Sequence, residues 1–200
     1  MTHFYTIEKP SVAEYKDRGS RFLAYAFPIQ TVDDFKKRIR EIKEEHPKAV
    51  HHCFAYRIGT DGNNFRAGDD GEPAGSAGKP ILNVLDSKTL TNTAVVVVRY
   101  FGGTLLGVPG LINAYKTTTS LALQLTPIVQ KPVLETYSLH FSYDGMNEVM
   151  TVVKRFNCVV LQNEMQLFCH LVVGVPKAEE ERFLEKMQDH HNVEVKKGSQ

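Results

Sequence analysis

Residues 95–115 read VVVVRYFGGTLLGVPGLINAY, and this stretch decides the fold of the first half of the chain. Its four consecutive β-branched valines predict a strand that is covered on both faces of a sheet. Four glycines follow within nine residues, at Gly102, Gly103, Gly107 and Gly110. A strand, a glycine-rich turn and a helix start bring backbone N–H groups to an exposed edge, where an anion or a partner's backbone can approach. The stretch therefore predicts a site between a strand over 95–100 and a helix over 109–125.

Strands and helices also alternate in the sequence before this stretch. We expect strands over 20–27 and 51–59, then a turn at 60–64 and a glycine-rich connection. Residues 31–46 predict a helix, because Thr31 and Asp34 form a capping box and an apolar stripe follows at helical spacing. A second helix is expected over 76–85. Pro127 and Pro132 then mark a short linker, so the first domain is expected to span residues 1–130.

The residues after this linker predict a second, smaller domain over 134–200. Strands are expected over 136–143, 158–162, 165–174 and 192–195, and a helix over 146–156 separates the first two. Pro176 is expected in the first turn of another helix, where the glutamates at 179–181 favour the positive end of the helix dipole. The resulting order β-α-β-β-α-β is that of a ferredoxin-like domain. The expected fold class is therefore α+β.

Composition and charge restrict the class of protein. The 200 residues are 42% hydrophobic and carry a formal net charge of +1, which gives no global signal for nucleic acid or membrane binding. Residues 133–200 hold 7 Lys or Arg against 10 Asp or Glu, and the remainder holds 17 against 13. Cys53, Cys158 and Cys169 are widely spaced and predict reduced thiols. Without a signal peptide or an apolar segment of membrane length, we expect a cytoplasmic protein with no membrane contact.

The segment VHHCFAYR, residues 50–57, contains two adjacent histidines. On a strand, His51 and His52 point to opposite faces of the sheet. One interpretation is a structural strand with one packed histidine and one at the surface. The alternative is a divalent metal site completed by carboxylates of the next motif, but no recognised ligand spacing is present. We therefore expect no metal ion and no cofactor.

The segment RAGDDGEPAGSAGKP, residues 66–80, is acidic and rich in glycine, and it does not fit a GxxxxGK[ST] phosphate loop. Its carboxylates, Asp69, Asp70 and Glu72, allow general acid–base catalysis. Alternatively, they cap the next helix across a tight turn. Ser76 has no activating base nearby in the sequence and lies in no GxSxG elbow. No catalytic residue is assigned, and the three carboxylates with the two histidines remain the candidates.

The valine strand ends in a cation and two aromatic residues, Arg99, Tyr100 and Phe101. The glycine intervals that follow do not match a GxGxxG nucleotide fingerprint. Arginine and aromatic side chains together can bind a phosphate and stack on a base, and the same residue types can anchor a protein contact. A third interpretation places Tyr100 and Phe101 in the core.

The motifs HHCFAYRIG, RAGDDGEPAGSAGKPIL and VVVVRYFGGTLLGVPGLINAY, in this order, closely resemble the signatures of the IMPACT/YigZ family. The resemblance covers the whole chain, including the smaller C-terminal domain of the bacterial members. It implies an N-terminal α/β domain like domain two of small-subunit ribosomal protein five. It also implies that the ferredoxin-like domain is similar to a domain of elongation factor G, whose fourth and fifth domains contact the ribosome.

The resemblance also implies a function. Eukaryotic members regulate translation with the help of an N-terminal RWD domain, which we do not expect in this bacterial two-domain form. The leading hypothesis is a non-enzymatic regulator of translation whose N-terminal domain binds the ribosome or structured RNA, with a protein of the translation machinery as an alternative partner. Carried over by motif, the binding residues are Lys79, Arg99, Tyr100, Phe101, Gly102, Gly103, Gly107 and Gly110.

Two residues depart from the family pattern. Many members have glycine where Pro109 stands and arginine where Asn113 stands. Pro109 removes a backbone donor from the helix start and Asn113 removes a cation, so both weaken a phosphate-binding interpretation. Two rival functions stay open. One is a small enzyme acting on a phosphorylated or peptide-like ligand in an acidic, histidine-lined cleft, and the other is a protein-interaction module anchored on Tyr100 and Phe101.

Overall fold

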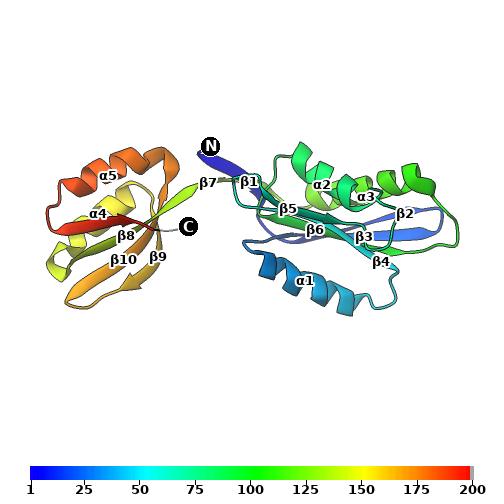
Figure 1. The fold of residues 1–200 in the computed structure, drawn as a ribbon, viewed down its shortest axis with the longest axis horizontal. Helices are drawn as coiled ribbons and strands as arrows, with labels where there is room; N and C mark the ends of the chain where they lie inside the picture. Colours follow the sequence, from blue (N-terminus) through cyan, green and yellow to red (C-terminus); the bar gives the residue numbers. More distant parts are fainter. Residues whose placement is uncertain (199–200) are drawn as a thin grey trace. The chain divides into compact units, whose positions relative to one another are not determined.

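The computed structural model describes residues 1–198, in which the chain divides into two compact units (Figure 1). The N-terminal unit spans Phe4–Lys131, and the C-terminal unit joins residues 1–3 to the chain from Pro132 onward. Each unit has its own sheet and its own helices, so the molecule is an α+β protein, as expected. No helix within residues 1–198 is long and apolar enough to cross a membrane.

The N-terminal unit is built on a five-stranded sheet in the order β2-β3-β6-β4-β5, with antiparallel neighbours throughout. Its strands are β2 (Ser11–Asp17), β3 (Ser20–Pro28), β4 (His51–Ile58), β5 (Asn64–Gly68) and β6 (Thr93–Tyr100). The valine run forms the centre of β6, and all four valines are buried. The prediction of a strand covered on both faces is confirmed.

Helices cover both faces of this sheet (Figure 1). On one face lies α1 (Val32–Glu45), and on the other lie α2 (Gly78–Ser87) and α3 (Gly107–Gln124). Successive strand residues point to opposite faces, so Val95 and Val97 of β6 pack in the core beneath α2 and α3, whereas Val96 and Val98 pack with α1. The predicted capping box of α1 is present, with both of its hydrogen bonds formed.

Four strands of this half were not expected from the sequence. They are β2 and β5, at the two edges of the sheet, and the pair β1 (His3–Ile7) and β7 (Ile128–Pro132), which form a two-stranded sheet. The sequence NFRAG of β5 is almost wholly exposed, so no apolar alternation marks it as a strand. It is held by backbone pairing with β4 instead. β7 occupies the stretch that was expected to be a linker.

The C-terminal unit has the predicted β-α-β-β-α-β order, with sheet order β11-β8-β10-β9. Its elements are β8 (Leu134–Ser142), α4 (Met146–Arg155), β9 (Val159–Glu164), β10 (Phe168–Pro176), α5 (Glu180–Gln188) and β11 (Val193–Lys197). Both helices pack on one face, where Leu139, Phe141 and Leu171 are buried with Val149 and Phe183. A short 3₁₀ turn, Lys177–Glu179, separates Pro176 from α5, so the helix begins later than expected.

Candidate functional site

The three sequence motifs of the N-terminal unit meet at one end of its sheet. His51 of β4 lies directly across from Arg99 of β6. Glu72 reaches the same place from the loop between β5 and α2, and Tyr115 reaches it from α3. Since all four side chains come from different elements, the cluster joins the sheet to the loop and to α3.

The centre of this cluster is a buried ion pair. Arg99 Nη1 donates to Glu72 Oε1 at 2.7 Å, and the two side chains are only 6% and 3% exposed. The Tyr115 hydroxyl donates to the same carboxylate oxygen at 2.7 Å. Arg99 Nη2 lies 3.3 Å from Ser20 Oγ. A buried charge is tolerated only when it is paired and hydrogen-bonded. Here the pair and its partners connect β3, β6, α3 and the loop between β5 and α2.

His51 lies at the edge of the same cluster. Its Nδ1 is 2.7 Å from the carbonyl oxygen of Asp70, and because a carbonyl only accepts, Nδ1 carries the proton. Its Nε2 faces Glu72 Oε2 at 3.8 Å. Asp70 has a positive φ of 42°, and its carboxylate accepts the backbone N–H of His52 at 2.7 Å. The loop is thus fastened to β4 through both histidines.

Asp69 caps the start of α2. Its carboxylate accepts the backbone N–H groups of Gly75, Ala77 and Gly78 at 2.8, 3.1 and 2.8 Å. Burial raises the pKa of Asp69, but these three donors outweigh burial and hold the pKa of the carboxyl below its ordinary value. The buried Ser76 hydroxyl donates to the Pro73 carbonyl oxygen at 2.6 Å. Both contacts support the interpretation that the acidic segment is a tight turn whose carboxylates cap the next helix.

Tyr100 and His52 lie on the other face of the sheet. The Tyr100 hydroxyl bonds His46 Nδ1 at 2.8 Å, and the Tyr25 hydroxyl bonds His46 Nε2 at 2.6 Å. Burial lowers the pKa of His52, although the nearby negative charge of Asp70 acts to raise it. Alternation along the strands separates Tyr100 from Arg99 and His52 from His51, so neither pair converges on one ligand.

The exposed part of the site is the segment 101–106, here called the glycine loop, of which residues 101–105 are exposed and Leu106 is buried in the core. Its first residue, Phe101, is 48% exposed. The guanidinium carbon of Arg99 lies over the Phe101 ring, 5.6 Å from the ring centroid. The Gly102 N–H donates to Ser20 Oγ at 3.2 Å. A Cβ on Gly102 would lie 1.8 Å from the carbonyl carbon of Gly19. The loop is thus packed against the β2–β3 turn, where Arg18 is exposed.

Apolar side chains continue the exposed surface beyond the glycine loop. Leu105 is 81% exposed, and Val108 and Ile112 are exposed four residues apart on α3. Gly107 and Gly110 belong to the first turn of α3 itself, which begins two residues before the expected start. Lys79 is exposed in the first turn of α2. Sequence reasoning missed Ser20, for which no local signal exists, and Tyr115, which closes the quoted motif.

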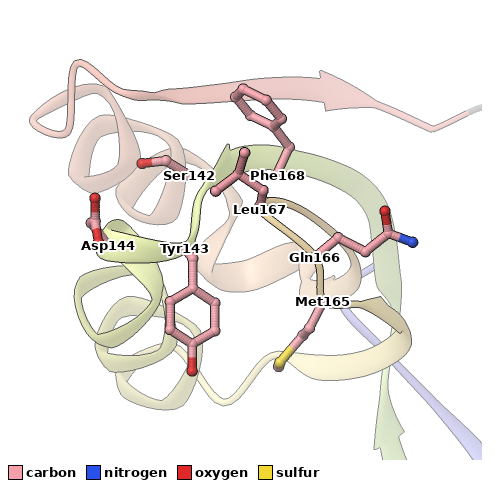
Figure 2. A pocket seen from close by; sticks show the side chains of 7 residues that line it. All are labelled: Ser142, Tyr143, Asp144, Met165, Gln166, Leu167 and Phe168. Atoms are coloured by element: carbon pink, nitrogen blue, oxygen red, sulfur yellow. The ribbon is translucent and has the colours of Figure 1, made fainter.

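A second exposed apolar surface lies on the C-terminal unit. It surrounds a hollow whose lining residues are Ser142, Tyr143, Asp144, Met165, Gln166, Leu167 and Phe168 (Figure 2). The close-up shows Tyr143 and Met165 pointing to one side and Phe168 to the other. No motif in the sequence predicts this surface.

Comparison with known proteins gives matches along the whole chain. The family model described as the Impact N-terminal domain matches residues 18–123. A Haemophilus influenzae protein named IMPACT family member is 34% identical, covering 92% of this chain and 91% of its own length. The Escherichia coli protein named IMPACT family member YigZ is also 34% identical, covering 86% and 85%. A solved structure described as that of a hypothetical protein is 29% identical, covers 100% of this chain and 99% of its own, and superposes with a TM-score of 0.78.

Proposed function

The chain belongs to the IMPACT family, and from this premise we propose that it regulates translation by binding the ribosome or structured RNA through its N-terminal unit. With this we propose the finer fold likeness as well. The N-terminal unit would resemble domain two of small-subunit ribosomal protein five, and the C-terminal unit would resemble a domain of elongation factor G. Both likenesses are to components that work on or in the ribosome.

One observation carries the proposal: the motif residues Arg99 and Glu72 point inward, while the glycine loop they hold points outward. The buried Arg99–Glu72 pair and Ser20 fix the base of the loop. Phe101 is left half-exposed at its start. An immobilised aromatic on a rigid loop binds at low entropic cost, which is the property of an interaction site.

The same observation assigns new roles within the motif. Arg99 is too deeply buried to meet a phosphate, so in this proposal it positions the loop. In this proposal Phe101 contacts the partner by stacking or apolar packing, and the exposed cations Arg18 and Lys79 contact its phosphates. The surplus of Lys and Arg over Asp and Glu before residue 133 favours an anionic partner.

The enzymatic alternative has less support in this geometry. Asp69 is occupied by three backbone donors, and Glu72 by Arg99 and Tyr115. Burial raises the pKa of the Cys53 thiol far above its ordinary value, so the thiolate is absent at neutral pH. These groups are committed to the fold and not to a substrate.

Co-sedimentation with ribosomes over a range of salt concentrations tests the proposal. Phe101→Ala is expected to weaken binding by about tenfold or more, as for an aromatic anchor. Phe65→Ala is the matched control, because Phe65 belongs to the same unit, is 50% exposed and also has an arginine over its ring, at 4.7 Å. It is expected to bind like the wild type. Equal binding by both variants and the wild type would rule out the glycine loop as the contact.

A charge variant separates the two kinds of contact. Arg18→Ala is expected to weaken binding and to lower its dependence on salt, because one cation–phosphate contact is lost. If Arg18 lies outside the interface, the salt dependence stays as in the wild type.

A protein-interaction module is the second candidate, and the exposed apolar row Leu105, Val108 and Ile112 favours it. In that case the partner is a protein of the translation machinery. Val108→Ser would then abolish capture of ribosomes, while binding to purified ribosomal RNA would be absent in both variant and wild type.

A further inference from the structure

One end of the C-terminal unit presents four large apolar side chains to solvent. They come from two segments, the 3₁₀ turn that follows β8 and the stretch from the β9–β10 turn to the start of β10. The four are Tyr143, Met165, Leu167 and Phe168, here called the apolar tip, and each is between 50% and 80% exposed. They line most of the hollow of about 620 Å³ in Figure 2. Large apolar side chains gathered at the surface in this way mark an interaction site.

The backbone beneath the apolar tip is fixed. The Tyr143 N–H donates to the carbonyl oxygen of Leu167 at 3.3 Å, which ties the two segments together. Phe168 pairs with Ser142 in the ladder between β10 and β8. Figure 2 shows Tyr143 and Met165, which come from different segments, pointing to the same side. Since these side chains are already placed, a partner loses little entropy in ordering them.

The charges around the apolar tip are negative. Residues 133–153 and 156–176 form β8, most of α4, β9 and β10, and they contain four Asp or Glu and no Lys or Arg. Asp144 lines the hollow itself, and Glu164 immediately precedes Met165. Both carboxylates are exposed. Such surroundings attract a cationic partner and repel an anionic one.

We propose that the apolar tip binds a basic protein segment. Apolar side chains of this segment pack on Phe168, Leu167 and their neighbours, while its Lys and Arg side chains face Asp144 and Glu164. Aromatic residues and methionine are enriched at the centre of protein interfaces. Nucleic acid and the anionic lipid of a membrane surface carry the wrong charge. A second copy of this chain would bring the same acidic surroundings, so like charges would meet.

This inference goes beyond the proposed function, because that function was assigned to the N-terminal unit. It gives the C-terminal unit a contact of its own, with a partner of different chemistry. The N-terminal unit carries the surplus of Lys and Arg and suits an anionic partner, whereas the apolar tip suits a cationic one.

A row of four ionisable side chains is the other conspicuous feature of this unit. Strand register brings Glu164, His170, His140 and Glu194 side by side across the sheet. The two imidazole rings stack with planes within 5°, and both Nε2 atoms meet the hydroxyl oxygen of Ser138. These nitrogens are therefore already engaged, and the row is part of the sheet surface and not a ligand site.

Fluorescence anisotropy of a short dye-labelled peptide, titrated with the full chain, tests the proposal. The peptide contains leucine and lysine in equal numbers, and its matched partner has glutamate in place of every lysine. We expect the lysine peptide to bind at least about tenfold more tightly than the glutamate peptide. The double variant Asp144→Asn with Glu164→Gln should weaken binding of the lysine peptide and lower its dependence on salt.

Single variants locate the contact. Leu167→Ser and Phe168→Ser should each weaken binding of the lysine peptide by about tenfold, as for buried anchors of an interface. Leu125→Ser is the matched control, because Leu125 is also mostly exposed but belongs to the N-terminal unit, and it should bind like the wild type. Far-UV circular dichroism confirms that each variant is folded, which is expected at exposed positions.

Three peptide results would overturn the proposal: no binding of the lysine peptide by the wild type, equal binding of both peptides, or unchanged binding in both Leu167→Ser and Phe168→Ser. Vesicle flotation and sedimentation velocity examine the other occupants. Binding to phosphatidylglycerol vesicles, or a dimer, that Leu167→Ser abolishes would assign the apolar tip to a membrane or to a second copy instead. The assays contain neither ribosomes nor RNA, so failure here is distinguishable from failure of the proposed function.

Discussion

Arg99 is a conspicuous motif residue whose side chain is buried in an ion pair and not presented at the surface. The sequence places a cation at the end of a buried strand, where a phosphate-binding role is a natural expectation. In the structure its guanidinium is turned inward to Glu72, with Phe22 and Phe101 rings 5.5 and 5.6 Å away. A single sequence cannot show this, because the direction of a strand residue depends on partners far along the chain.

The buried ion pair gives a prediction for stability. Arg99→Ala leaves the Glu72 carboxylate buried without its cation, which is expected to lower the free energy of unfolding by about 3–5 kcal/mol. Urea unfolding followed by circular dichroism measures this loss. The double variant Arg99→Leu with Glu72→Leu should lose less than the sum of the two single variants. Additive losses would mean that the two side chains do not form the pair described.

Gly102 gives a second prediction for stability. The β2–β3 turn leaves no room for a Cβ, which would lie 1.8 Å from Gly19 C and 2.1 Å from Ser20 N. Gly102→Ala is therefore expected to force the loop and the turn apart, at a cost of about 1–3 kcal/mol or more in unfolding free energy. Gly145→Ala meets nothing closer than 3.9 Å and should change stability little. Equal stability of both variants would refute the close packing.

Among the helices and strands, those with strong local signals were predictable and those held by pairing alone were not. The capping box and stripe of α1, and the valine run of β6, each define an element within a few residues. β5 has no such signal, because its side chains are exposed and only its backbone bonds to β4 specify it. The start of α3 was misplaced by two residues, because Gly107 reaches a positive φ of 70° at its first position.

The cap of α2 gives a prediction for pH dependence. Asp69→Ala removes the acceptor of three backbone N–H groups and is expected to cost about 1–2 kcal/mol near neutral pH. Because the folded state lowers the pKa of Asp69, this stabilisation is present above the unfolded pKa and disappears as the pH falls through the folded value. The difference in unfolding free energy between the wild type and Asp69→Ala should therefore become smaller below about pH 4.

Urea unfolding near pH 7 and near pH 3 measures this change. Asp33→Ala is the control, because Asp33 bonds only Lys36 at the surface and should show little effect at either pH. If the loss of unfolding free energy caused by Asp69→Ala is the same at both pH values, the capping role of Asp69 is contradicted.

For the whole molecule, the structure brings the three sequence motifs together, but the arrangement of their side chains was not predictable. The three motifs do converge at one end of the N-terminal sheet, where His51, Glu72 and Arg99 meet. Which motif residues face outward was not predictable, since Tyr100 lies on the opposite face of the sheet from Arg99, and the apolar Leu105 and Val108 of the same motif are exposed. The row of Glu164, His170, His140 and Glu194 in the C-terminal unit was equally hidden, because these four residues are distant in sequence and meet only through strand register.

Amide hydrogen exchange of the full chain, free and bound to ribosomes, tests whether the glycine loop is the ribosome-binding surface. We expect slower exchange on binding in the glycine loop, in the first turn of α3 and in the β2–β3 turn. The turn at 60–64 near Phe65 should exchange at the same rate in both states. Protection confined to residues 132–198, or no protection anywhere on the N-terminal unit, would contradict the claim that the glycine loop is the ribosome-binding surface.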